Sequence, residues 1–372
     1  MNLFDTARQG VFSLDPSPVV TLYSCGITPY DAAHLGHAFV YLTFDVLQRR
    51  LRDQGMETRC VRNVTDVDDD ILRKARQLGV HYLDLAAREM ARFERDMRLI
   101  NLHPVYNEPR ATGAIAEIVT LVDALVNAGH AYVVDGWVYF NVHSAPSFGH
   151  VSHFSREEMI FLAGVHGGNP DDPRKRDPLD FVLWQPSLED EPAWESRFGP
   201  GRPGWHIECS ALAMRDLGST VDIHGGGRDL VFPHHECEAV QSEAVTGQPF
   251  VRFWVHVGLV GYEGTKMSKS LGNLVFVSDL AERSEPAAVR LALLQQHYRH
   301  DWEWHDELLA KAQSRLATWR SSLGGRSSDV VDQVRAALDD DLNTPEALRA
   351  VDEAALAGAN VAPAAELLGV TL

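Results

Sequence analysis

The chain has 372 residues, 45% of them hydrophobic and 23% charged, which is typical of a globular protein with two or three domains. No apolar run approaches the roughly 18 residues that cross a bilayer, and residues 1–10 lack the basic start and apolar centre of a secretory signal. The net charge of −18 argues against a general nucleic-acid binder, and four cysteines in a chain expected in the cytoplasm indicate metal ligation or burial rather than disulfides.

A strand, a turn rich in reactive side chains and a helix open the chain. Residues 19–23 form an apolar run that predicts a buried strand, and residues 38–52 carry apolar side chains at helical spacing. The turn between them contains a thiol and two imidazoles, at the place where strand–turn–helix units bind ligands. A second strand is expected near residues 58–64, with Cys60 buried inside it as a small apolar residue.

The next segment predicts an insertion between two halves of a parallel sheet. Residues 68–126 are mostly amphipathic and helical, and residues 132–140 form a hairpin around Asp135-Gly136. Residues 166–178, rich in glycine and proline, form either a mobile cover or a plain linker. We therefore place a helical and hairpin insertion at about residues 68–178.

The second half returns to the sheet and then becomes helical. Strands are expected at residues 181–184, 221–224 and 251–257, and helices at residues 206–217 and 233–245. From residue 286 onward the pattern is helical to the end, as in a helical bundle. The sequence thus predicts an α/β catalytic domain at residues 1–285 and a C-terminal helical bundle at residues 286–372.

Two short motifs suit phosphate chemistry. His34 and His37 lie at a helix start, where imidazoles and amides meet phosphate oxygens, and Gly36 between them leaves room for a nucleotide. Lys266 and Lys269 flank Met-Ser on a glycine-bounded loop and suit the charge of departing pyrophosphate. Each motif alone is weak evidence for phosphate binding; a lysine pair, for example, usually lies on a solvated face. The order of the two motifs along the chain, with a glycine run between them, strengthens the evidence from both.

Four further residues form a candidate zinc site. Cys25 follows the first strand, Cys209 lies at a helix start, and His234 and Glu238 lie four residues apart on one helix face. Two thiolates, an imidazole and a carboxylate are a suitable zinc shell, although each residue singly would be read as an ordinary buried side chain. Cys237 faces elsewhere on the helix and is not expected to bind metal.

Together these motifs resemble class I aminoacyl-tRNA synthetases, with residues 34–37 as the "HIGH" motif and residues 266–270 a literal "KMSKS". The similarity narrows to the cysteine-activating branch. That branch is matched at residues 25–26, 63–66, 201–209, 232–236 and 339–345. The resemblance implies a Rossmann-like parallel-sheet catalytic domain and adenylation of cysteine by ATP with Mg²⁺.

The resemblance also implies roles for individual residues. Cys25, Cys209, His234 and Glu238 match the zinc ligands of that branch, and His34, His37, Lys266 and Lys269 would stabilise the phosphates. The residues implied to line the adenylate are Gly26, Ile27, Thr28, Asn63, Val64, Thr65, Trp205, Gly227, Arg228, Asp229 and Val260.

The amine that receives the cysteine is the remaining question. A tRNA ligase carries an anticodon-binding domain after the bundle, whereas this chain stops at Leu372, a layout similar to the cysteine ligases of mycothiol biosynthesis. That resemblance implies L-cysteine, ATP and the amine of glucosaminyl-inositol as substrates of an enzyme that we expect to be a monomer without membrane contact. Residues 166–170, Val40 and Glu238 depart from the mycothiol pattern.

Four alternatives therefore stay open from the sequence. The chain could charge tRNA, or transfer cysteine to another amine in secondary metabolism. It could also be a simple nucleotidyltransferase, since these enzymes use His-x-Gly-His as well, or a non-catalytic remnant that binds zinc or a partner. The intact lysine motif at residues 266–270 argues against the remnant.

Overall fold

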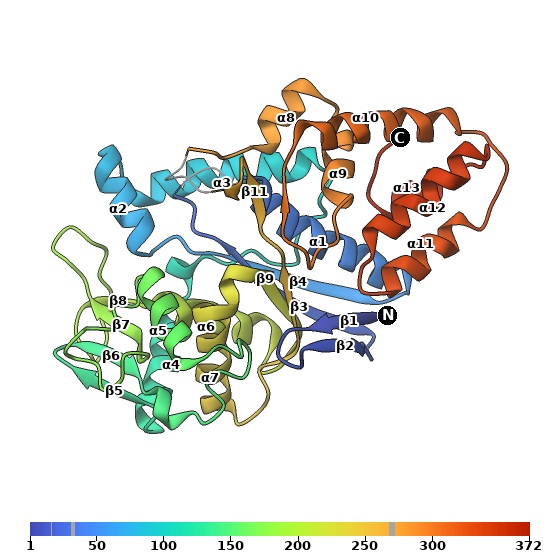
Figure 1. The fold of residues 1–372 in the computed structure, drawn as a ribbon. Helices are drawn as coiled ribbons and strands as arrows, with labels where there is room; N and C mark the ends of the chain where they lie inside the picture. The colour runs from blue at the N-terminus through green and yellow to red at the C-terminus, as the bar shows by residue number, and fades with distance from the viewer. Residues whose placement is uncertain (16, 31–33, 268–271) are drawn as a thin grey trace.

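The structure, a computed structural model, describes residues 1–15, 17–30, 34–267 and 272–372. At its centre lies a sheet of four parallel strands in the order β10-β9-β3-β4 (Figure 1). These strands are β3 (Val19–Ile27), β4 (Glu57–Val64), β9 (Val221–Gly227) and β10 (Val251–Val257). A hairpin of β1 (Asn2–Asp5) and β2 (Gly10–Ser13) precedes the sheet.

The helix after the first central strand, α1 (Leu35–Asp53), links the sheet to the rest of the core. Its apolar side chains, Leu42 and Leu47 among them, are buried in one cluster with strand residues such as Leu22. The ring of His34 caps the first turn by accepting a hydrogen bond from the amide of Gly36. The predicted strand and helix are thus confirmed, and Cys60 is buried in β4 as expected. Cys25, which the sequence placed in the turn, lies inside β3, and residues 31–33 of the predicted turn lie outside the described residues.

The insertion combines helices with an antiparallel sheet of its own. The helices are α2 (Asp69–Leu78), α3 (Tyr82–Leu99), α4 (Ile115–Asn127) and α5 (Arg156–Val165). The strands, in the order β5-β6-β7-β8, are β5 (Ala131–Val134), β6 (Trp137–Phe140), β7 (Phe181–Pro186) and β8 (Gly201–Pro203). The antiparallel sheet therefore continues beyond residue 178, where the sequence placed the end of the insertion, because residues 181–186 pair with the hairpin and not with the central sheet.

The loop at residues 166–178 is tied to this hairpin. Tyr139 donates a hydrogen bond to Asp172 (2.8 Å), and Tyr132 donates one to Asp180 (2.7 Å) just beyond the loop. The guanidinium of Arg174 lies 3.9 Å from the ring centroid of Trp137. These contacts hold the loop against the hairpin, which fits neither a mobile cover nor a plain linker.

The second half supplies the remaining helices around the sheet. They are α6 (Trp205–Leu217), α7 (Glu236–Thr246), α8 (Val277–Arg283) and α9 (Pro286–Leu294), with the small strands β11 (Val260–Tyr262), β12 (Thr265–Lys266) and β13 (Trp302–Glu303). The segment Val231–His235 that precedes α7 is kinked, because Phe232 has extended backbone angles (φ −141°, ψ 136°). The helix predicted from residue 233 begins directly after this kink and runs into α7.

The bundle consists of α10 (Asp306–Ser321), α11 (Val330–Asp339), α12 (Thr344–Leu356) and α13 (Ala362–Leu367). Figure 1 shows it at the opposite end of the molecule from the antiparallel sheet β5–β8. Its apolar residues share one buried cluster with α1, so the predicted domain division at residue 285 crosses a continuous core and stays a prediction. None of the described helices is long and apolar enough to cross a membrane.

A buried ion pair stabilises the packing of the C-terminal helices against α1. Arg290 of α9 is fully buried and donates to Asp45 of α1 (2.5 Å) and to the carbonyl oxygens of Leu368 and Ile100 (2.8 Å each). Burial by itself raises the pKa of Asp45, but the charges of Arg290 and Arg49 outweigh it and hold that pKa below its ordinary value. Arg290 thus joins α1, α9 and the C-terminal segment in one contact.

We expect Arg290→Met to lower the free energy of unfolding by about 3–5 kcal/mol, because it removes a buried guanidinium from the Leu368 and Ile100 carbonyls and leaves the Asp45 carboxylate with Arg49 as its remaining cation. Urea unfolding followed by circular dichroism measures this change. Arg349→Met is the matched control, since Arg349 pairs only with Glu346 and Glu353 on the surface of its own helix and should leave the midpoint nearly unchanged. Equal midpoints for the two variants would contradict the account of this junction.

Candidate functional site

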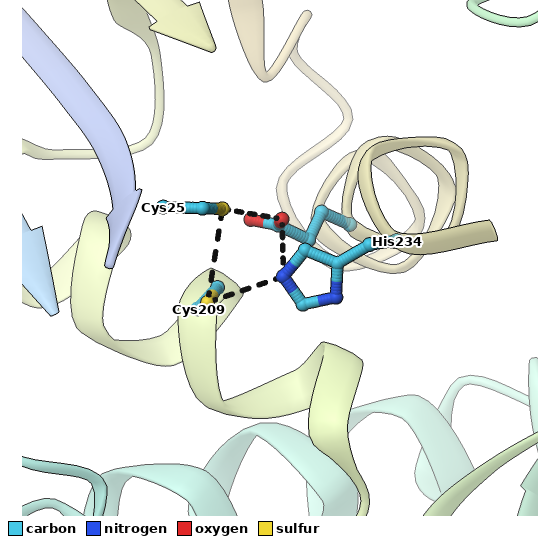
Figure 2. A group of neighbouring side chains, drawn as sticks. Cys25, Cys209 and His234 are labelled. Atoms are coloured by element: carbon cyan, nitrogen blue, oxygen red, sulfur yellow. Dashed lines mark hydrogen bonds and ion pairs between the residues drawn. The ribbon is translucent and has the colours of Figure 1, made fainter. Parts of the chain in front are cut away.

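Four side chains from separate elements converge at the carboxyl end of the central sheet. Figure 2 shows Cys25 of β3, Cys209 of α6 and His234 of the segment before α7 pointing toward one another, and Glu238 of α7 completes the group. The sulfur of Cys25 lies 4.0 Å from the sulfur of Cys209 and 3.4 Å from Oε1 of Glu238. Nε2 of His234 lies 3.3 Å from the Cys209 sulfur and 3.1 Å from Oε1 of Glu238. The sequence-predicted ligand set is therefore assembled.

The electrostatics of this group suit a bound cation. All four side chains are buried, and burial raises the pKa of the Cys25 thiol well above its usual value, with Cys209 and Glu238 adding to the effect. Burial also lowers the pKa of His234 well below its usual value, so the ring is neutral and its nitrogen can act as a ligand. A divalent cation would reverse the preference of the thiols, because it stabilises thiolate directly. Two sulfurs, one imidazole and one carboxylate fit a four-coordinate metal site.

Neighbouring rings fix the orientation of His234. Its Nδ1 lies 2.9 Å from Nδ1 of His206, and the Trp205 ring stacks on it with centroids 4.1 Å apart. These contacts occupy the far nitrogen and one face of the ring, so that Nε2 is directed at Cys209 and Glu238. Trp205, which the sequence placed at the adenylate, therefore lies against a residue of the candidate metal site.

Sequence reasoning missed two histidines beside this group. Nε2 of His235 lies 3.3 Å from the Cys25 sulfur, and Nε2 of His224 lies 3.0 Å from Oε2 of Glu238. Among the described residues, Cys25, His224, His235 and Glu238 form a second group with metal-binding geometry, and Cys237 is in neither group. In the sequence, these two histidines were marked only by their positions: His224 ends the predicted strand at residues 221–224, and His235 follows the predicted ligand His234.

Next to Cys25, the backbones of β3 and β4 approach each other closely. A Cβ on Gly26 would lie 1.5 Å from the carbonyl oxygen of Asn63, so only glycine fits there. The Asn63 side chain accepts a hydrogen bond from the Gly26 amide (2.8 Å) and donates one to the Thr65 hydroxyl (3.0 Å). The amide of Thr65 in turn donates to the carbonyl of Ile27 (3.1 Å). The two strand ends therefore form one rigid unit that includes five of the predicted adenylate-lining positions, Gly26, Ile27, Asn63, Val64 and Thr65.

Backbone hydrogen bonds hold the described residues on both sides of the lysine motif, and one of these bonds comes from the start of α1. The His37 ring accepts a hydrogen bond from the His34 amide (3.3 Å), and the two rings lie 4.2 Å apart. The amide of Leu35, at the start of α1, donates to the carbonyl of Val275 (2.8 Å), directly after the lysine loop. On the other side of that loop, the Met267 amide donates to the carbonyl of Val260 (3.3 Å). Lys269 and the side chain of Lys266 lie outside the described residues.

Three other residues predicted to line the nucleotide, Gly227, Thr28 and Arg228, differ in what surrounds them. A Cβ on Gly227 would lie 2.5 Å from Oδ1 of Asp229, so a side chain there would displace the Asp229 carboxylate. Thr28 donates a hydrogen bond to Asp68 (3.1 Å) at the start of α2. Arg228 differs, since its guanidinium pairs with Asp301 (3.0 Å) and donates to the carbonyl of Arg299. The role of Arg228 in binding nucleotide therefore stays a prediction, and its observed partners are other parts of the protein.

Known proteins resemble the chain over nearly all of its length. Residues 13–314 match the family described as tRNA synthetases class I (C) catalytic domain. The chain is 47% identical to the L-cysteine:1D-myo-inositol 2-amino-2-deoxy-alpha-D-glucopyranoside ligase of Streptosporangium roseum, over 99% of this chain and 92% of that protein. It is 50% identical to the ligase of the same name from a Parafrankia species, over 95% and 81% of the respective chains.

Solved structures support the same architecture. A methionyl-tRNA synthetase of Mycobacterium tuberculosis in complex with methionyl-adenylate matches with a TM-score of 0.64 at 18% identity, over 91% of this chain and 82% of that one. This similarity confirms the predicted class I α/β fold. On the family match and the near full-length relatives, the chain belongs to the class I tRNA synthetases of the (C) type, in the group of the L-cysteine:1D-myo-inositol 2-amino-2-deoxy-alpha-D-glucopyranoside ligases.

Proposed function

We propose that the chain is an ATP-dependent ligase that activates L-cysteine as cysteinyl-adenylate and transfers it to the amine of glucosaminyl-inositol. The observation that carries the proposal is the buried group of two thiols, an imidazole and a carboxylate beside Gly26, which belongs to the rigid strand pair next to α1. Relatives at 47% and 50% identity are ligases named for this acceptor, which supports the choice of amine. A monomer in the cytoplasm is part of the same proposal.

The metal that fits this group best is zinc. Cys25, Cys209, His234 and Glu238 would hold it, and it would bind the sulfur of substrate cysteine as thiolate. Such recognition is needed because serine differs from cysteine only at the heteroatom, and an apolar pocket separates such near-isosteres by only about 1–3 kcal/mol.

The chain's own residues would handle the nucleotide. In the first step the cysteine carboxylate attacks the α-phosphorus of ATP, the bond to the bridging oxygen breaks, and pyrophosphate leaves. The amides at the start of α1, with His34 and His37, are suited to the phosphate oxygens, and Lys266 and Lys269 to the charge that grows on pyrophosphate. Mg²⁺ accompanies ATP in this family.

In the second step the acceptor amine attacks the acyl carbon and AMP leaves. Gly26 and Asn63 hold the strand ends at a fixed separation, and Trp205 restrains the ring of His234. These residues would keep the acyl group in place between the two steps.

We expect Cys209→Ser to remove both the bound zinc and cysteine-dependent ATP–pyrophosphate exchange, because serine is a poor ligand for this metal. Elemental analysis and the exchange assay measure the two effects on the same preparation. Cys237→Ser is the matched control, since Cys237 is equally buried on α7 but belongs to neither metal-binding group. Normal exchange by a metal-free Cys209→Ser protein would contradict the assignment.

A second comparison identifies the ligand set. His224→Gln should retain zinc if Cys209 and His234 complete the site, because His224 belongs only to the alternative group with His235. The same metal analysis decides the matter: zinc retained by Cys209→Ser and lost by His224→Gln would assign the alternative group.

Lys269→Ala should slow adenylate formation by about 10²–10³-fold while changing the affinity for ATP much less, since the lysine is proposed to act on charge that develops during the reaction. Single-turnover adenylate formation at a series of ATP concentrations separates the two quantities. Equal losses in both would assign Lys269 to ground-state binding.

The acceptor is tested by supplying enzyme, ATP and cysteine with either glucosaminyl-inositol or tRNA and measuring AMP release. We expect release with the amino sugar, whereas release with tRNA alone would establish the tRNA-charging alternative. ATP–pyrophosphate exchange that does not depend on cysteine would favour a simple nucleotidyltransferase.

A further inference from the structure

The acidic turn between α11 and α12 has an unusual backbone. Asp341 and Leu342 both adopt left-handed conformations, with φ of +56° and +50°. Neither is glycine, and such conformations cost about 1–3 kcal/mol each unless the surroundings determine them. This turn belongs to the motif at residues 339–345, which none of the proposed chemical steps uses.

Asp341 is buried and joins three separate parts of the chain. Its Oδ1 accepts hydrogen bonds from the Phe4 amide of β1 (2.8 Å) and from the Tyr298 hydroxyl (2.6 Å). Its Oδ2 forms an ion pair with Nε of Arg299 (2.5 Å). The strained turn thus presents one carboxylate that holds residues 298–299 in place.

Residues 298–302 are in turn bound to the segment that precedes the lysine loop. The Gly258 amide donates to the Tyr298 carbonyl (2.7 Å), and the Leu259 amide donates to Oδ1 of Asp301 (2.8 Å). A Cβ on Gly258 would lie 2.1 Å from the His300 carbonyl oxygen, so the two backbones touch. Val260, an adenylate-lining position by resemblance, comes directly after this contact.

Arg228 fastens the glycine turn to the same segment. Its Nη1 pairs with Asp301 (3.0 Å), the carboxylate that also accepts from Leu259, and its Nη2 donates to the Arg299 carbonyl. Gly227 and Asp229, on either side of Arg228, are adenylate-lining positions by resemblance. Two walls of the nucleotide site, the glycine turn and Val260, are therefore fixed to residues 298–302.

We propose that Asp341 is a positioning residue for ATP, which sets the placement of these two walls through residues 298–302 and Arg228. The inference deepens the proposed function and rests on its use of ATP. It gives the acidic turn of the bundle a role in the first step without contact with substrate. Arg228 has a positioning role too, because it links the glycine turn to residues 298–302.

We expect Asp341→Asn to raise the KM for ATP about tenfold, because the amide keeps the acceptor for Phe4 and Tyr298 but loses the charge that pairs with Arg299. The kcat and the KM for cysteine should stay unchanged, since the metal-binding group and the start of α1 are on other elements. Asp301→Asn should act in the same direction. The double variant should show less than the product of the two effects, because both act through one segment.

Asp339→Asn is the matched control, because Asp339 lies in the same motif but pairs with Arg50 and Gln54 of α1. It should leave the KM for ATP unchanged, and thermal unfolding without nucleotide corrects for any loss of stability. An unchanged KM for ATP in Asp341→Asn, or an equal rise in Asp339→Asn, would overturn the proposal. Calorimetric measurement of ATP affinity repeats the comparison of the variants without catalysis. If the wild type lacked cysteine-dependent exchange, the proposed function would be refuted, but the calorimetric comparison would still test the role of Asp341.

Discussion

The site depends on one electrostatic constraint: two thiols, a carboxylate and an imidazole are buried together at the end of the parallel sheet. Without a cation, burial drives the thiols toward their neutral forms, as the raised pKa values of Cys25 and Cys209 show. The four residues come from β3, α6, the kinked segment Val231–His235 and α7, so their convergence requires each of these elements in place. A bound metal ion would stabilise this donor set, because its charge favours thiolate and carboxylate in a buried site.

The same sheet edge brings the nucleotide motifs next to the metal-binding group. Gly26 follows Cys25 directly, and its contact with Asn63 joins β3 to β4. The start of α1 is bonded to Val275 on the far side of the lysine loop, so a described residue that flanks this loop lies beside a helix start more than two hundred residues earlier in the sequence. Sulfur recognition and phosphate chemistry can therefore act on one small substrate, as adenylation of an amino acid requires.

The sequence predicted the central sheet, α1 and the convergence of the four candidate ligands, because strand ends and the i, i+4 spacing of His234 and Glu238 place those side chains reliably. It did not reveal His224 and His235, since a histidine in a buried strand or beside another ligand looks like ordinary core. The end of the insertion was misplaced because an apolar strand, residues 181–184, does not disclose which sheet it joins. Similarly, the direction of the Arg228 side chain depends on Asp301, a partner 73 positions away that no local pattern indicates.

The most direct test of the central claim is to replace the bound metal with cobalt(II) and titrate the protein with cysteine or serine. The account predicts that cysteine adds thiolate-to-cobalt absorption and that serine at the same concentration does not, because the substrate sulfur joins the metal held by Cys25, Cys209, His234 and Glu238. A spectrum that stays the same on saturation with cysteine, in protein that carries the metal, would contradict the account.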